Sequence, residues 1–129
     1  MAISHVGVIG CGLMGSGIAQ VCAQKGCKVI VREVTEDFLK KGLDRIRGFL
    51  ADGVKRGKVT QADMDATLAN LKGTTRISDL KDCDIVIEAI IENLDEKRKV
   101  FAELDATLKP GAIIASNTSS ISITAMAAA

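Results

Sequence analysis

The fold is decided by the sequence HVGVIGCGLMGSG, residues 5–17. A short apolar run ends at Ile9, and glycines follow at positions 10, 12 and 15. An apolar strand that runs through Gly-x-Gly-x-x-Gly into a helix is the fingerprint of a dinucleotide-binding βαβ unit. Gly10 permits a tight turn, Gly12 leaves space for a pyrophosphate, and Gly15 lets helix and strand pack closely. The pyrophosphate is expected at the helix start, where free N–H groups and the helix dipole favour negative charge.

The flanking sequence supports this interpretation and indicates the coenzyme. Leu13 and Met14 lie inside the turn and are candidate coenzyme contacts. Glu33 follows the next apolar run, 18 positions after Gly15, where a carboxylate can accept hydrogen bonds from both adenosine ribose hydroxyls. The same charge would repel the 2′-phosphate of NADP, so NAD is the predicted coenzyme. Two alternatives stay open, because Arg32 could accommodate a 2′-phosphate and because FAD-binding domains share this pattern.

The composition is that of one α/β domain spanning residues 1–129. Hydrophobic residues make up 47% of the chain and aromatic residues only 2%, which suits the aliphatic core of a parallel sheet. A formal net charge of +1 argues against nucleic acid or a membrane surface as a general partner. With no 18-residue apolar run and no signal-peptide pattern, the chain is expected to be cytoplasmic. The four cysteines lack metal-ligand spacing, and we expect no metal site.

Strand and helix patterns alternate along the chain. The expected helices are 12–24, a long helix from Thr35 to about Asp52, a helix from Thr60 through Leu71, and 94–108; the expected strands are 5–9, 28–32, 74–77, 84–89 and 112–115. This alternation predicts a Rossmann-type, doubly wound parallel sheet with an inserted helical pair after the second strand. The ligand is then expected at the carboxyl ends of the strands.

A basic segment, Gly53–Lys58, joins the two inserted helices. It carries Lys55, Arg56 and Lys58, three cations within four residues. Such a group suits a phosphate, but most charged loops are simply solvated, and the pattern alone leaves both interpretations open.

Four segments resemble the 3-hydroxyacyl-CoA dehydrogenase family: residues 8–20, 55–60, 84–94 and 114–121. The most specific is Ile114-Ala115-Ser116-Asn117-Thr118-Ser119-Ser120-Ile121, which a generic dinucleotide-binding domain has no reason to contain. The resemblance implies an NAD-dependent oxidoreductase that interconverts (S)-3-hydroxyacyl-CoA, with 3-hydroxybutyryl-CoA the expected substrate, and 3-oxoacyl-CoA in fatty-acid or butanoate metabolism.

The resemblance also implies residue roles. For the coenzyme, it implies that Glu33 holds the adenosine ribose and that the nicotinamide half lies along Ala89, Glu92 and Lys97. It implies that Asn117 and Ser119 lie where the nicotinamide meets the 3-oxygen of the substrate. The coenzyme A moiety of the substrate is expected at Lys55 and Arg56, together with Ser119. Asn117 and Ser119 are the candidate catalytic residues. An amide and a hydroxyl are suitable donors to an oxygen that gains charge during hydride transfer.

One part of the family pattern is missing. The family's general base is a histidine in a His-Phe-Phe-Asn-Pro segment after a sixth strand, oriented by a glutamate and followed by a helical domain that forms a homodimer. This sequence ends at Ala129 without that segment, and its only histidine is His5. We therefore expect an NAD-binding domain truncated before strand six and inactive alone. The alternatives are a non-enzymatic NAD-binding or structural module, like the lens proteins among the relatives, and a related hydroxyacid or sugar-acid dehydrogenase.

Overall fold

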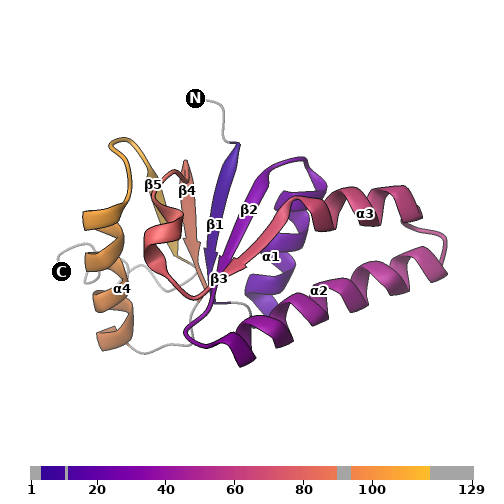
Figure 1. Ribbon diagram of the computed structural model, residues 1–129, viewed down its shortest axis with the longest axis horizontal. Coiled ribbons are helices and arrows are strands. Elements are labelled where there is room, and N and C mark those ends of the chain that lie inside the picture. The colour runs from indigo at the N-terminus through magenta and orange to yellow at the C-terminus, as the bar shows by residue number, and fades with distance from the viewer. Residues whose placement is uncertain (1–3, 11, 90–93, 117–129) are drawn as a thin grey trace.

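The computed structural model describes residues 4–10, 12–89 and 94–116 (Figure 1). Five parallel strands form one sheet in the order β3-β2-β1-β4-β5. The strands are β1 (His5–Ile9), β2 (Lys28–Arg32), β3 (Leu71–Thr74), β4 (Ile85–Glu88) and β5 (Ile113–Ser116); the helices are α1 (Leu13–Gln24), α2 (Glu36–Lys55), α3 (Gln61–Ala69), the 3-10 helix η1 (Ile77–Leu80) and α4 (Leu94–Thr107). Because the chain winds outward from β1 in one direction and then in the other, the predicted doubly wound α/β fold is confirmed.

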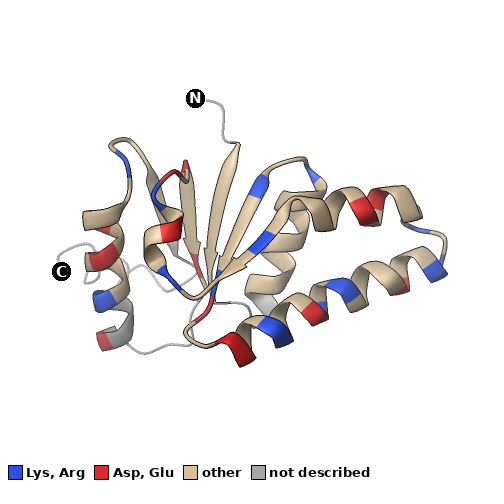
Figure 2. Ribbon diagram, in the orientation of Figure 1, with Lys and Arg blue, Asp and Glu red and all other residues tan. Residues whose placement is uncertain are grey.

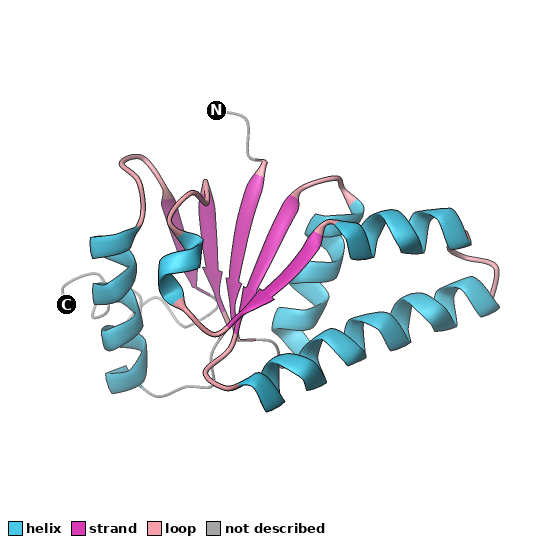
Figure 3. Ribbon diagram, in the orientation of Figure 1, coloured by secondary structure: helices cyan, strands magenta, loops and turns pink. Residues whose placement is uncertain are grey.

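Helices cover both faces of the sheet (Figure 3). Val6 and Val8 of β1 pack in one apolar cluster with residues of α1 and α2, whereas Ile9 belongs to a second cluster with η1 and α4. This alternation follows from the two-residue period of a strand. Gly7 faces the second cluster, where an added Cβ would lie 3.1 Å from both Leu80 and Val86 side chains. The central strand is therefore buried on both faces, as its apolar sequence predicted.

The inserted helical pair is confirmed. The side chain of Thr35 accepts a hydrogen bond from the Phe38 N–H at the start of α2, and that of Thr60 accepts one from the Asp63 N–H at the start of α3. Such caps satisfy N–H groups that have no partner within the helix. Together α2 and α3 form a hairpin whose tip projects well beyond the sheet (Figure 1).

The predicted limits of the third strand and of both inserted helices were wrong; the helix predicted through Leu71 ends at Ala69, and Leu71 begins β3. The third strand is Leu71–Thr74 rather than 74–77, because it pairs in register with β2, and Ile77 instead begins η1. The second helix continues past Gly53 to Lys55. Val59 packs against that glycine, and an added Cβ would lie 3.0 Å from its Cγ2 atom. Half of the basic segment is thus helical, and this contact compensates for glycine in a helix interior.

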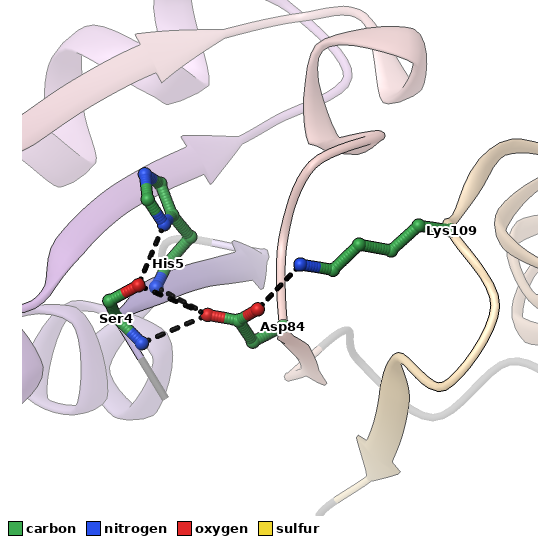
Figure 4. A network of polar contacts seen from close by, with 4 residues as sticks. All are labelled: Ser4, His5, Asp84 and Lys109. Carbon is green, nitrogen blue, oxygen red and sulfur yellow. Dashed lines mark hydrogen bonds and ion pairs between the residues drawn. The ribbon is translucent and has the colours of Figure 1, made fainter. Parts of the chain in front are cut away.

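Asp84 was expected in the fourth strand, but it precedes β4 and joins three segments (Figure 4). Its Oδ2 atom accepts hydrogen bonds from the backbone N–H groups of Ser4, at 2.9 Å, and His5, at 3.0 Å. Its Oδ1 atom accepts one from Lys109 Nζ at 2.6 Å. The Lys109 ammonium, and after it the two N–H groups, hold the pKa of Asp84 well below its usual range. This carboxylate therefore ties the start of β1 to the start of β4 and to the turn before β5.

This network predicts a defined loss of stability in acid. A depressed pKa in the folded state means that the Asp84 contribution is fully present above the unfolded-state pKa, about 4, and is lost as the pH falls below it. We expect Asp84→Asn to lower the thermal unfolding midpoint at pH 7, and the gap from wild type to shrink between pH 4 and pH 2. Asp44→Asn, which alters an exposed ion pair with Arg47, is the matched control and should show no comparable gap at either pH. An Asp84→Asn midpoint equal to wild type at pH 7 would contradict the role of the network.

Candidate functional site

The glycine turn is built by contacts that exclude side chains. Gly10 adopts a φ of 92°, a left-handed conformation that favours glycine, and its N–H donates to the Arg32 carbonyl at 3.0 Å. A Cβ on Gly15 would lie 1.8 Å from the carbonyl oxygen of Gly10 and 3.5 Å from the Cβ of Ala89. The first turn of α1 thus lies directly against the end of β1. The roles predicted for Gly10 as the turn residue and Gly15 as the packing residue agree with this geometry.

Gly12 lies in a different environment. It is exposed and precedes α1 in an extended conformation, and no atom of the described residues lies within 4 Å of a Cβ built on it. No side chain caps the helix, and the first turn, which begins at Leu13 and Met14, contains no acidic residue. The N–H groups that precede Ser16 in this turn have no intrahelical partner, whereas that of Ser16 donates to the Gly12 carbonyl at 2.8 Å, and the helix dipole is positive here. The space above Gly12 therefore fits an anionic group such as a pyrophosphate.

Glu33 lies one residue beyond the end of β2, beside the glycine turn. The register pairs Ile9 with Arg32, so Gly10 and Glu33 follow paired residues of adjacent strands. The backbone N–H of Glu33 donates to the Thr74 carbonyl at 3.1 Å, and its Oε1 atom accepts from the Val34 N–H at 3.3 Å. These contacts hold a half-buried carboxylate where the sequence predicted a ribose ligand.

Arg32, the residue that left NADP open, is also half-buried. Its Nε atom donates to the Thr75 carbonyl at 3.3 Å, which directs the side chain toward the segment after β3. The Arg32 guanidinium therefore has a backbone hydrogen-bond partner, and this contact does not indicate that it binds a 2′-phosphate.

The carboxyl ends of β4 and β5 lie side by side on the other flank of the turn. Ala89 donates its N–H to the Ile9 carbonyl at 2.8 Å, and Glu88 is paired with Ser116. Glu88, at the end of β4, is completely buried. The sequence predicted no role for it, although an acidic residue within a run of β-branched residues was a signal that could have indicated one. Of the other predicted site residues, Lys97 lies in α4, and Glu92, Asn117 and Ser119 lie outside the described residues.

Lys55 and Arg56 are not brought to this edge. Lys55 is in the last turn of α2 and Arg56 is its C-cap, so both lie at the tip of the hairpin, where Figure 2 shows cations around the connection to α3. The Arg56 Nε atom lies 3.0 Å from Asp52 Oδ2 in an exposed ion pair. The structure therefore places the basic segment far along the hairpin from the glycine turn.

Within the described residues, no three His, Cys, Asp or Glu side chains are grouped so that they could hold a metal ion. No helix in the same part of the chain is long and apolar enough to cross a membrane.

Substitution of Gly12, which precedes α1, and of Gly15 and Gly17 within α1 should give three different results. Gly15→Ala places a methyl group against backbone, and we expect a loss of about 3 kcal/mol in the free energy of unfolding, together with loss of NADH binding. Gly12→Ala meets no atom in the part of the chain that the structure describes, so the fold should persist while NADH binding falls at least tenfold, because the methyl group occupies the anion space. Gly17→Ala also meets nothing and is the matched control, with normal binding and an unfolding free energy higher by about 0.5–1 kcal/mol. Urea unfolding and NADH fluorescence titration measure both quantities; normal binding by Gly12→Ala would contradict the assignment.

Comparisons with known proteins agree with this geometry. The family described as 3-hydroxyacyl-CoA dehydrogenase, NAD binding domain, matches residues 5–129. A 3-hydroxybutyryl-CoA dehydrogenase of Bradyrhizobium diazoefficiens is 49% identical over 98% of this chain and 43% of its own length.

Two solved structures are also similar. The (S)-3-hydroxybutyryl-CoA dehydrogenase of Ralstonia eutropha has a TM-score of 0.92 at 45% identity, over 98% of this chain and 45% of its own. The 3-hydroxybutyryl-CoA dehydrogenase of Escherichia coli has a TM-score of 0.94 at 41% identity, over 99% and 27%. The chain thus spans less than half the length of each of these relatives. The glycine turn, the sheet order and these matches show that the chain belongs to the family of NAD-binding domains of 3-hydroxyacyl-CoA dehydrogenases.

Proposed function

We propose that this chain is the coenzyme-binding part of a cytoplasmic, NAD-dependent oxidoreductase that interconverts (S)-3-hydroxyacyl-CoA, in particular 3-hydroxybutyryl-CoA, and 3-oxoacyl-CoA. The observation that carries the coenzyme assignment is the contrast between Gly15, which is closed by the Gly10 carbonyl, and Gly12, which faces open space. The substrate assignment is supported by the names of the relatives and by the segment that follows β5.

The sheet order supports one direction for the bound coenzyme across the strand ends. Glu33 is at the end of β2, the glycine turn follows β1, and Ala89 follows β4, so these groups occupy three adjacent strand ends. We place the adenosine ribose at Glu33, the pyrophosphate at Gly12, and the nicotinamide half along Ala89, with Glu92 and Lys97 beside it. When bound, NAD accepts or supplies the hydride. The task of these residues is to bind and orient it.

Asn117 and Ser119 are proposed as the donors to the substrate oxygen. Asn117 directly follows β5, whose last residue, Ser116, is paired with Glu88 next to the glycine turn. A donor after β5 is therefore close to the nicotinamide half in the order of the sheet. An amide and a hydroxyl there would hold the 3-oxygen and stabilise the charge that it gains.

Proton transfer needs a general base, and the histidine of this chain does not lie near the turn. His5 is the only histidine in the sequence and begins β1, at the opposite end of the strand from Gly10. Its Nδ1 atom is within 3.0 Å of Ser4 Oγ. We propose that catalysis uses a base from a segment outside these 129 residues, that such a segment also forms a homodimer, and that Lys55 and Arg56 meet the coenzyme A nucleotide.

Binding of reduced coenzyme tests the coenzyme assignment. We expect NADH to bind at least tenfold more tightly than NADPH, because Glu33 is placed to accept the ribose hydroxyls and would repel a 2′-phosphate. Glu33→Ala should weaken NADH binding and reduce this ratio severalfold, whereas Glu36→Ala, a change of an exposed carboxylate in the first turn of α2, should preserve it. Fluorescence titration of the three proteins with both coenzymes gives the six dissociation constants, and tighter binding of NADPH by the wild type would refute the assignment.

Turnover tests whether the general base lies outside this chain. General acid–base groups typically contribute 10²–10⁴-fold to a rate, so this chain alone should reduce acetoacetyl-CoA with NADH at least about 100-fold more slowly than the Ralstonia eutropha enzyme. The assay follows NADH absorbance at saturating coenzyme. A comparable rate would show that the base lies within these residues, and Ser119→Ala would then establish whether that hydroxyl participates.

A further inference from the structure

The turn between α1 and β2 brings two cysteines together at the end of the sheet opposite the glycine turn. Gly26 adopts a φ of 93°, its N–H donates to the Ala23 carbonyl at 3.1 Å, and the N–H of Cys27 donates to the Cys22 carbonyl at 3.1 Å. This pair of hydrogen bonds defines a Schellman motif. Cys22 occupies position C3 and Cys27 occupies position C″, the two positions whose side chains are commonly in contact in this motif.

The backbone hydrogen bond limits how far apart the two residues can be. Since the Cys27 N–H bonds the Cys22 carbonyl directly, standard backbone dimensions keep their Cα atoms less than about 7 Å apart, close to the range found across disulfides. Both side chains are half-buried and pack against the same apolar cluster. Burial, and after it the neighbouring Cys27, raise the pKa of the Cys22 thiol. The two cysteines are therefore neighbours in this turn, and each is partly exposed to solvent.

We propose that Cys22 and Cys27 form a redox modification site, in which a hydroperoxide converts the two thiols to an intramolecular disulfide across the end of α1. One thiolate attacks the peroxide, its O–O bond breaks, and a sulfenic acid and an alcohol, or water from hydrogen peroxide, are formed. The second thiol then displaces water from the sulfenic sulfur, and the S–S bond forms. Overall the two thiols lose two electrons and two protons, and the peroxide is reduced by two electrons.

The location of this site separates it from the proposed coenzyme chemistry. The crosslink would join the last turn of α1 to the start of β2, whereas Gly12 and Glu33 lie at the opposite ends of these same elements. It therefore constrains a joint that the native hydrogen bonds already hold. We expect NADH affinity to change less than twofold on oxidation. The thermal unfolding midpoint should rise by about 5 °C, because the crosslink restricts the unfolded chain.

The sequence offers a direct assay. Lys25 lies between the two cysteines and Lys28 follows Cys27, so trypsin releases Cys27 in the peptide 26–28 and Cys22 in the peptide that ends at Lys25. After treatment with hydrogen peroxide, alkylation and digestion without reductant, a disulfide keeps these peptides joined, with a mass about 2 Da below their sum, until dithiothreitol is added. Fragment ions distinguish Cys22 from Cys11, which lies in the same peptide.

The expected result is a joined peptide through Cys22 in the wild type, and none in Cys22→Ser or Cys27→Ser. The rate should increase from pH 7 to pH 9, because the thiolate and not the thiol attacks the peroxide. One equivalent of phenylarsine oxide should also protect both thiols of the reduced protein from alkylation, which tests their proximity without oxidation. Separate oxidation of the two cysteines, a link through Cys11, or no protection by the arsenical would each overturn the proposal. None of these results depends on NADH binding.

Discussion

The structure depends on one backbone contact, in which the α-carbon of Gly15 lies against the carbonyl of Gly10. A Cβ at position 15 would come within 1.8 Å of that oxygen, so no side chain fits between helix α1 and the end of β1. This contact fixes where α1 begins and leaves Gly12 facing open space. It also brings Ala89, at the end of β4, against the same helix turn. One steric constraint thus sets both the shape of the turn and its distance from the neighbouring strand ends.

The opposite end of the central strand is held by charge instead of by steric exclusion. Asp84 accepts the first N–H groups of β1 and an ammonium hydrogen of Lys109, which connects β1, β4 and the turn before β5. Strand ends of this kind expose backbone donors that need partners, and the Asp84 carboxylate satisfies two of them, the N–H groups of Ser4 and His5. These contacts at the amino ends of the strands therefore help to maintain the strand alignment.

The other chemically distinctive residues lie at the carboxyl ends of the strands, at their amino ends, or at the tip of the α2–α3 hairpin. Glu33 and Ala89 lie with the glycine turn at the carboxyl edge, and the two thiols of the α1–β2 turn lie at the amino edge. The basic tip, with Lys55 and Arg56, is carried away from both by α2, a helix of 20 residues. The glycine turn, where the coenzyme is placed, and the α1–β2 turn, where oxidation of Cys22 and Cys27 is proposed, thus lie at opposite ends of the sheet. Neither process therefore acts directly on the other.

The sequence by itself determined the parts that rest on local patterns. Glycine spacing predicted the turn, Thr35 and Thr60 predicted two helix starts, and the placement of Glu33 after β2 followed from the length of the βαβ unit, because each depends on residues near one another in the chain. Only the tertiary structure decided where β3 begins, why α2 passes through Gly53, and what Asp84 does. These answers depend on pairing with β2, on packing by Val59, and on Lys109, which is 25 residues from Asp84. Long-range partners of this kind leave no periodic trace in the sequence, because their contacts form only when the chain has folded.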